Sequence, residues 1–179
     1  MQIYADNAAT TKPCKAAIQA MVSCMEQNYG NPSSVHHIGQ AAAEALLQAR
    51  QDIAACLGCS AREIYFTSGG SEADNQALRS AAYAGAKEGK KHIISTVIEH
   101  HAILHTLKQL EEEGFSVTLL EVSKTGIVTP EQVAAAIRPD TCLVSVMFAN
   151  NEIGTIEPIA EIGAVCREKG VLFHTDAVQ

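Results

Sequence analysis

The stretch Phe66-Thr67-Ser68-Gly69-Gly70-Ser71-Glu72-Ala73-Asp74-Asn75 joins two runs of contrasting composition. The run before it, Ile64-Tyr65-Phe66, is apolar and β-prone, whereas the run after it is rich in alanine and continues to Lys87 without a proline. We therefore predict a strand over 64–67, a glycine turn, and a helix over 71–87.

The start of that helix has the chemistry of an anion site. Gly69 and Gly70 leave no side chain in the way of a ligand, and the free N–H groups of the first turn carry the positive end of the helix dipole. Ser68 and Ser71 add hydroxyl donors. Because Ser71 and Asp74 also match a capping box, a phosphate cup and an ordinary capped helix start both remain open.

The rest of the chain alternates between predicted helices and strands. A helix opened by Pro13 and a long helix from about residue 36 to 57 come first. Further strands are predicted at 92–97, 115–120, 141–148 and 171–174, with helices at 101–113, from 130 onward and at 158–169. Repeated strand–helix units predict an α/β fold, a mainly parallel sheet with helices on both faces.

Composition excludes several classes of function. The 179 residues are 47% hydrophobic with a formal net charge of -7, so a basic nucleic-acid-binding surface is not expected. The N-terminus lacks the pattern of a signal peptide and no apolar run is long enough to cross a membrane, so we expect a cytoplasmic protein. Of the six cysteines, Cys56 and Cys59 form a CxxC. With no second ligand pair nearby, we expect no metal site. We interpret Gly58 between them as a helix C-cap, and a redox CxxC remains the less favoured alternative.

Polar groups follow the predicted strands at the edge where α/β proteins bind ligands. They are the hydroxyls at Ser68–Ser71, the imidazole of His100, the carboxamide of Asn151, the carboxylate of Asp176, and Gln179. A flat, nitrogen-containing ring with a phosphate would use this set, and pyridoxal phosphate is such a molecule. Taken singly, His100 could be an exposed helix-start residue, Asn151 a turn former and Asp176 a helix cap. His101 and His105 could share a metal, but no third ligand is evident.

The motifs that carry these groups resemble a known family. They are Asp6-Asn7-Ala8-Ala9-Thr10-Thr11, Asn31-Pro32-Ser33-Ser34, Thr67-Ser68-Gly69, Glu99-His100, Asn150-Asn151-Glu152-Ile153-Gly154 and His174-x-Asp176-Ala177-x-Gln179. In this order they are similar to cysteine desulfurases of the NifS/IscS type, which belong to the class V aminotransferase family of fold-type I pyridoxal phosphate (PLP) enzymes. The resemblance implies that residues 16–179 are part of the PLP-binding large domain, preceded by an N-terminal segment, 1–15.

The resemblance also implies a role for each candidate residue. Gly70 and Ser71 would bind the PLP phosphate, and His100 would stack on the ring and assist proton transfer. Asp176 would pair with the ring nitrogen, while Asn151 and Gln179 would contact the phenolic oxygen. Family members take sulfur from L-cysteine, leaving alanine and an enzyme persulfide for Fe–S cluster or thio-cofactor assembly through a sulfur-acceptor or scaffold protein, and they are homodimers.

The chain departs from the family pattern in one respect. It ends at Gln179, before the segment in which the family carries its Schiff-base lysine, and no cysteine here matches the persulfide-forming position. We therefore expect an N-terminal portion that retains part of the PLP site and does not turn over cysteine alone. Another class V PLP enzyme, such as a selenocysteine lyase or an aminotransferase, and a non-catalytic binding module with this fold remain open.

Overall fold

The computed structural model describes residues 3–179 and divides the chain into two compact units, Met1–Phe66 and Thr67–Gln179. Each unit is described here by itself. The predicted boundary between an N-terminal segment, 1–15, and a large domain, 16–179, stays a prediction. No helix within residues 3–179 is long and apolar enough to cross a membrane.

The first unit consists of α1 (Lys15–Gln27), α2 (His37–Leu57) and a 3-10 helix, η1 (Ala61–Glu63). Both long helices were predicted, although α1 begins two residues after Pro13, because the Cys14 side chain caps it by accepting a hydrogen bond from the Ala17 N–H at 3.4 Å. Gly58 ends α2 in the left-handed conformation, as the sequence indicated. The CxxC is therefore a helix end.

The predicted strand over 64–67 is absent. The backbone at Ile64 is extended, with φ -92 and ψ 124, but residues 64–67 join no strand ladder among the described residues. The Ile64 carbonyl instead accepts a hydrogen bond from the Arg50 guanidinium, and Tyr65 is exposed. An extended, β-prone segment becomes a strand only when a neighbouring strand offers its backbone groups.

The second unit contains a parallel sheet in the order β2-β1-β3-β4. The strands are β1 (His92–Thr96), β2 (Ser116–Leu120), β3 (Thr141–Ser145) and β4 (Leu172–His174). In the register, Ile94 lies beside Thr118 on one side and Val144 on the other. All four strands were predicted, and β3 is shorter than the apolar run 141–148 because its hydrogen-bonded ladder ends at Ser145.

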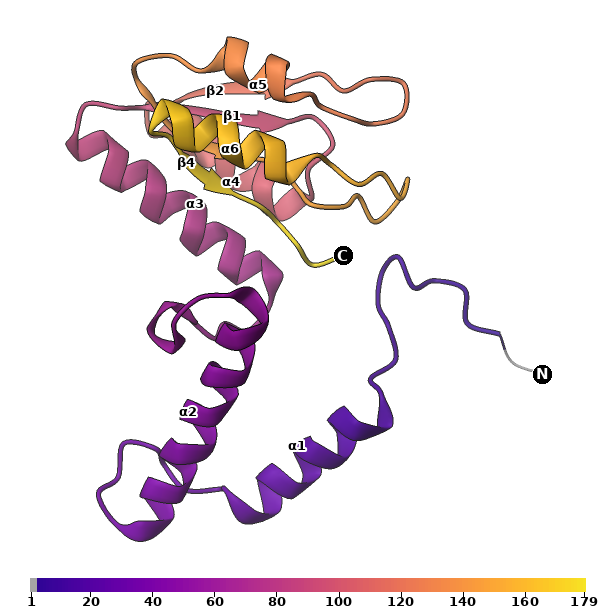
Figure 1. Cartoon of the computed structure of the whole chain (residues 1–179), viewed down its shortest axis with the longest axis vertical. Coiled ribbons are helices and arrows are strands. Elements are labelled where there is room, and N and C mark those ends of the chain that lie inside the picture. Colours follow the sequence, from indigo (N-terminus) through magenta and orange to yellow (C-terminus); the bar gives the residue numbers. More distant parts are fainter. Residues whose placement is uncertain (1–2) are drawn as a thin grey trace. The chain divides into compact units, whose positions relative to one another are not determined.

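Helices cover both faces of this sheet, as predicted (Figure 1). They are α3 (Gly70–Lys87), α4 (His101–Glu112), α5 (Pro130–Ala136) and α6 (Ile159–Lys169). On one face, Ile93 and Leu143 pack with α3 and α4, and on the other, Ile94 and Val144 pack with α5 and α6. Successive strand residues point to opposite faces, and each fully buried Ile or Leu stabilises the fold by about 1.5–3 kcal/mol.

The direction of the helices sets the position of the candidate site. Each strand runs toward the same edge of the sheet, and α4 begins there because it follows β1. The helix α3 packs along the same face, with Gly85 in its last turn so close to β3 that an added Cβ would lie 2.3 Å from the Cys142 Cβ. The first turns of α3 and α4 therefore lie toward the carboxyl edge.

Candidate functional site

The helix α3 begins as the anion site predicted from its glycines. Gly69 is the N-cap and no side chain caps the helix, in contrast to α2, α4 and α5, whose caps are His36, His100 and Thr129. The Ala73 N–H donates to the Gly69 carbonyl at 3.1 Å, so the N–H groups before it point out of the helix. These groups can hold an anion.

The capping-box interpretation of Ser71 and Asp74 is wrong. The helix starts one residue earlier than predicted, which places Ser71 within the first turn and turns Asp74 inward. Glu72 is the residue that reaches back, accepting hydrogen bonds from the Ser68 N–H and hydroxyl at 2.6 Å each. The Ser68 hydroxyl is therefore occupied, and Ser71 supplies the hydroxyl near the helix start.

His100 lies beside this helix start. It caps α4 through its Nδ1 atom, which accepts a hydrogen bond from the Ala102 N–H at 3.2 Å. His100 and Ser71 line the same cavity, of about 370 Å³, together with Asn75, His101, Ala102, His105, Thr106 and Gln109. The structure thus brings two of the predicted residues, from α3 and α4, to one hollow.

Asp176 lies on the extended segment that follows β4. The Phe148 N–H donates to its carbonyl at 2.8 Å, and its carboxylate accepts a hydrogen bond from the Val178 N–H at 3.0 Å. The same segment approaches α3 closely, because a Cβ on Gly70 would lie 2.9 Å from the Val178 Cγ2. A larger residue at position 70 would push the Val178 side chain aside, so glycine there suits the close approach of the segment after β4.

Two further carboxyl groups are buried around these residues. Burial, and then the nearby Asp176, raise the pKa of Asp74 to about 6, against the opposite effect of His100. Burial likewise raises the pKa of Glu99 to about 7 against hydrogen bonds from the Met147 N–H and the Thr96 hydroxyl. Raised carboxyl pKa values of this kind are typical of functional sites, where burial and nearby charges tune ionisable groups.

Some polar atoms at this edge have no partner. Among the described residues, the buried Glu99 Oε2 and Thr175 Oγ1 form no hydrogen bond within the protein. An unpaired buried oxygen costs about 1–3 kcal/mol, so native proteins keep few of them. Glu99 and Thr175 are next to His100 and Asp176 in the sequence, so these unpaired oxygens are available to a ligand at the carboxyl edge.

The remaining two predicted residues are Asn151 and Gln179. Asn151 is half-buried in the turn after β3, and Gln179 is exposed at the end of the segment after β4. The neighbouring Asn150 ties that turn to the end of β1, because its side-chain amide donates to the Ile98 carbonyl at 3.0 Å. The cofactor contacts assigned to Asn151 and Gln179 stay predictions.

The groups present at this edge fit a phosphate-bearing pyridine. Uncapped N–H groups and the Ser71 hydroxyl suit a phosphate, and the Asp176 carboxylate suits a protonated ring nitrogen. The donor set does not resemble a metal centre, and no group of three or more His, Cys, Asp or Glu suited to a metal occurs within residues 3–179.

The sequence interpretation missed the inward orientation of Asp74. The buried residues of α3 are Asp74, Leu78, Ala82 and Gly85, which recur every three to four positions on one helical face. Helical periodicity alone therefore places Asp74 on the apolar face, and a carboxylate on such a face is a signal of function or of a paired charge.

Comparisons with known proteins agree along the whole chain. The family model described as Aminotransferase class-V matches residues 3–179. Among curated relatives, "Cysteine desulfurase IscS" of Methanosarcina thermophila is 52% identical over 177 residues, covering 99% of this chain and 44% of that protein. "Cysteine desulfurase IscS" of Azotobacter vinelandii is 50% identical over 182 residues, covering 100% of this chain and 45% of that protein.

Solved structures give the same result. A structure described as "NIFS-LIKE PROTEIN" superimposes with a TM-score of 0.95 at 40% identity, covering 100% of this chain and 50% of that one. A second, "SspA in complex with cysteine", has a TM-score of 0.91 at 41% identity, covering 96% and 49%. The chain spans a little under half the length of the curated relatives it matches. Since the family model covers residues 3–179, this chain belongs to the class V aminotransferase family.

Proposed function

We propose that this protein is a PLP-dependent cysteine desulfurase. The observation that carries the proposal is the identity of about half its residues, along the whole chain, with proteins named cysteine desulfurase. The site supports it, because the uncapped start of α3, His100 and Asp176 lie at the carboxyl edge of one sheet.

The described residues would divide the binding of PLP among them. The N–H groups at Gly70 and Ser71, with the Ser71 hydroxyl, hold the phosphate, and the Asp176 carboxylate keeps the ring nitrogen protonated. Asn151 and Gln179 contact the phenolic oxygen. PLP, when bound, supplies an electron sink that stabilises negative charge on the α-carbon of the substrate.

His100 is the candidate for proton transfer. Its Nδ1 accepts the Ala102 N–H, so the neutral ring carries its proton on Nε2. Nε2 is therefore the atom that exchanges a proton with a ligand, while the hydrogen bond at Nδ1 fixes the plane of the ring. A fixed plane also suits stacking of the imidazole on a flat cofactor.

The overall reaction is balanced without an external oxidant. The C–S bond of L-cysteine breaks and an S–S bond forms on a thiol of the enzyme. The β-carbon is reduced to the methyl group of L-alanine while sulfur is oxidised to a persulfide, and the proton lost by the thiol balances the proton gained by that methyl group. The receiving thiol is a cysteine that we do not assign to this chain. A sulfur-acceptor or scaffold protein, a homodimer and a cytoplasmic location are part of the proposal by family membership.

The proposal is tested on the protein produced from its own gene and loaded with PLP. We expect L-cysteine to yield L-alanine and, with a reductant, sulfide in equal amounts, measured by chromatography and sulfide detection. Turnover of L-selenocysteine but not L-cysteine would identify a selenocysteine lyase, and amino-group transfer to a keto acid would identify an aminotransferase. Either result would overturn the desulfurase proposal.

Binding by the 179-residue chain tests the cofactor separately. Pyridoxamine 5′-phosphate is the suitable probe, because it lacks the aldehyde that reacts with surface lysines. We expect Ser71→Ala to weaken its binding about tenfold, the value of one hydrogen bond to a charged group. A Ser71→Thr variant, which keeps the hydroxyl, is the matched control and should bind within about twofold of the native chain.

A further inference from the structure

Asp74 and His174 meet across the buried side of the candidate site. Asp74 lies in the second turn of α3, and His174 is the last residue of β4. The His174 Nε2 lies 3.6 Å from the Asp74 Oδ1, and both side chains are largely buried. Neither residue has a role in the cofactor contacts proposed above, although each lies within three residues of one that does.

The second ring nitrogen of His174 determines the character of this contact. Nδ1 lies 2.9 Å from the Ser145 hydroxyl at the end of β3. At 3.6 Å the contact with Asp74 is longer than a hydrogen bond and is electrostatic; the tautomer with its proton on Nε2 directs that positive N–H toward the carboxylate and leaves Nδ1 to accept from Ser145. Burial lowers the pKa of His174 against the effect of Asp176, so the ring is neutral near pH 7. The contact joins a carboxylate to an oriented neutral imidazole.

The contact joins the two ends of the proposed cofactor site, the phosphate end at Gly70 and Ser71 and the ring-nitrogen end at Asp176. Asp74 is three residues after Ser71 on one rigid helix, and His174 is two residues before Asp176 on an extended backbone. That backbone continues alongside the chain after β3, through hydrogen bonds from the Val146 N–H to the His174 carbonyl and from the Phe148 N–H to the Asp176 carbonyl. A shift between Asp74 and His174 would therefore move the phosphate end relative to the ring-nitrogen end.

A purely structural role does not account for the carboxylate. Its pKa, raised to about 6 by burial and Asp176, lies above the ordinary value of 3.8. A carboxyl group with a raised folded pKa lowers the stability of the fold at pH 7, and this penalty declines as pH falls from about 6 to 3.8. An uncharged residue of similar size would avoid this cost.

We propose that Asp74 and His174 are positioning residues that hold the phosphate cup at Gly70 and Ser71 in register with Asp176. The proposal rests on the proposed function, because PLP is the ligand that spans both ends. The pair governs binding of a ligand that occupies the cup and the ring-nitrogen site together. The affinity for a ligand that occupies the cup alone does not depend on the pair.

The test compares two probes on the 179-residue chain. Pyridoxamine 5′-phosphate spans both ends, and inorganic phosphate occupies only the cup, where the Gly70 and Ser71 amide signals in NMR spectra report it. We expect Asp74→Asn to weaken binding of pyridoxamine 5′-phosphate about tenfold and to leave phosphate binding within about twofold. Asp140→Asn, the same chemical change on a half-exposed residue that pairs with Arg138 at the other edge of the sheet, should alter neither.

Two additional measurements separate positioning from folding. The urea midpoint of Asp74→Asn at pH 8 should equal or exceed that of the native chain, because the variant removes a buried charge. Loss of ligand affinity without loss of stability is a result that a structural role does not produce. In addition, the double variant with His174→Asn should bind no more weakly than either single variant, because one contact is lost in all three.

The outcomes distinguish the inference from the proposed function. If the native chain binds pyridoxamine 5′-phosphate no more tightly than phosphate, the PLP site itself is wrong and the inference falls with it. If the native chain binds tightly and Asp74→Asn binds equally well, the inference alone is wrong. Equal weakening of both probes by Asp74→Asn would also overturn it, because the residue would then support only the cup.

Discussion

The two edges of the sheet each bury a histidine, and they treat it differently. At the amino edge, His92 begins β1 and is fully buried between two threonines. Its Nδ1 lies 2.8 Å from the Thr141 hydroxyl and its Nε2 lies 2.9 Å from the Thr118 hydroxyl. At the carboxyl edge, His174 faces a buried carboxylate at 3.6 Å. One ring is matched by neutral partners and the other lies among charges.

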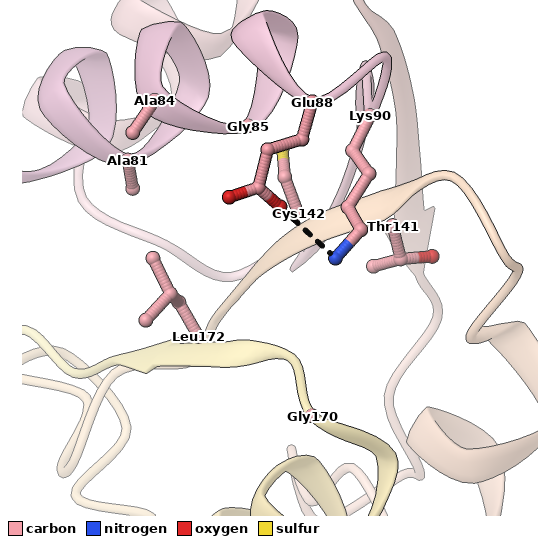
Figure 2. A pocket seen from close by; sticks show the side chains of 9 residues that line it. All are labelled: Ala81, Ala84, Gly85, Glu88, Lys90, Thr141, Cys142, Gly170 and Leu172. Carbon is pink, nitrogen blue, oxygen red and sulfur yellow. Dashed lines mark ion pairs between the residues drawn. The ribbon is translucent and has the colours of Figure 1, made fainter.

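The polar groups around the two histidines differ in the same way between the two edges. At the amino edge, a cavity of about 260 Å³ (Figure 2) is lined by the Glu88–Lys90 ion pair, whose atoms lie 3.5 Å apart, and by small residues from α3. The buried Cys142 thiol on its wall donates to the His92 carbonyl at 3.3 Å. At the carboxyl edge, Glu99 Oε2 and Thr175 Oγ1 lack partners within the described residues. The amino edge satisfies its polar groups, whereas the carboxyl edge holds polar groups that a ligand can use.

The largest expected effect on stability comes from removing His92, whose ring nitrogens both have partners at the amino edge. His92→Ala removes a fully buried ring and takes the ring partner from both threonine hydroxyls, although the Thr141 hydroxyl still accepts from the Arg138 N–H at 2.8 Å. We therefore expect a loss of about 3 kcal/mol in the free energy of unfolding. Urea denaturation followed by circular dichroism measures it. His101→Ala, at an exposed position on α4, is the control and should change stability by less than about 0.5 kcal/mol. A loss of under about 1 kcal/mol for His92→Ala would contradict the assigned role of the amino edge.

A smaller effect of opposite sign is expected at the carboxyl edge. Glu99 has a folded pKa of about 7, above its ordinary value of 4.5, so through this group the fold loses stability as pH rises from about 4.5 to about 7. Glu99→Gln keeps an oxygen for the Thr96 and Met147 donors but buries an unpaired amide N–H. We therefore expect a net gain of about 1–2 kcal/mol at pH 8.

The pH dependence checks this assignment. At pH 5, close to the unfolded pKa of 4.5, little of this penalty remains and the unpaired amide of the glutamine offsets it, so Glu99→Gln should bring no gain in the urea midpoint there. The native chain itself should lose stability between pH 5 and pH 8 through this group. An equal gain at both pH values would show that the gain does not come from the charge of Glu99.

The smallest effect concerns the exposed rim of the amino edge. The Arg138 guanidinium lies 2.9 Å from the Asp140 carboxylate and 3.2 Å from the Ser116 hydroxyl, and the pair is solvent-exposed. Arg138→Gln should lower the free energy of unfolding by no more than about 0.5 kcal/mol. The loss should shrink further in 0.5 M salt, since salt screens exposed charges. A larger, salt-independent loss would mean that Arg138 contributes packing as well as charge.

Local patterns predicted most elements of the second unit. Apolar runs of suitable length gave the strands, and the Thr129–Pro130 pair marked the start of α5, where the Thr129 hydroxyl accepts the Gln132 N–H at 3.2 Å. The errors arose where an element depends on distant partners. The segment 64–67 has strand propensity without a neighbouring strand among the described residues, and Ser71 has capping chemistry at a position inside the helix.

The amino-acid sequence by itself determined the α/β class, the family and the predicted positions of Gly70, Ser71, His100 and Asp176, because periodicity and motif spacing are local properties of the chain. The tertiary structure decided which of these groups share an environment. The carboxylate of Asp74 has a raised pKa because it is buried in the fold and because the segment after β4 brings Asp176 near it, while β4 itself places His174 3.6 Å away. Burial and charge proximity depend on contacts between residues far apart in the chain, and sequence spacing does not contain them.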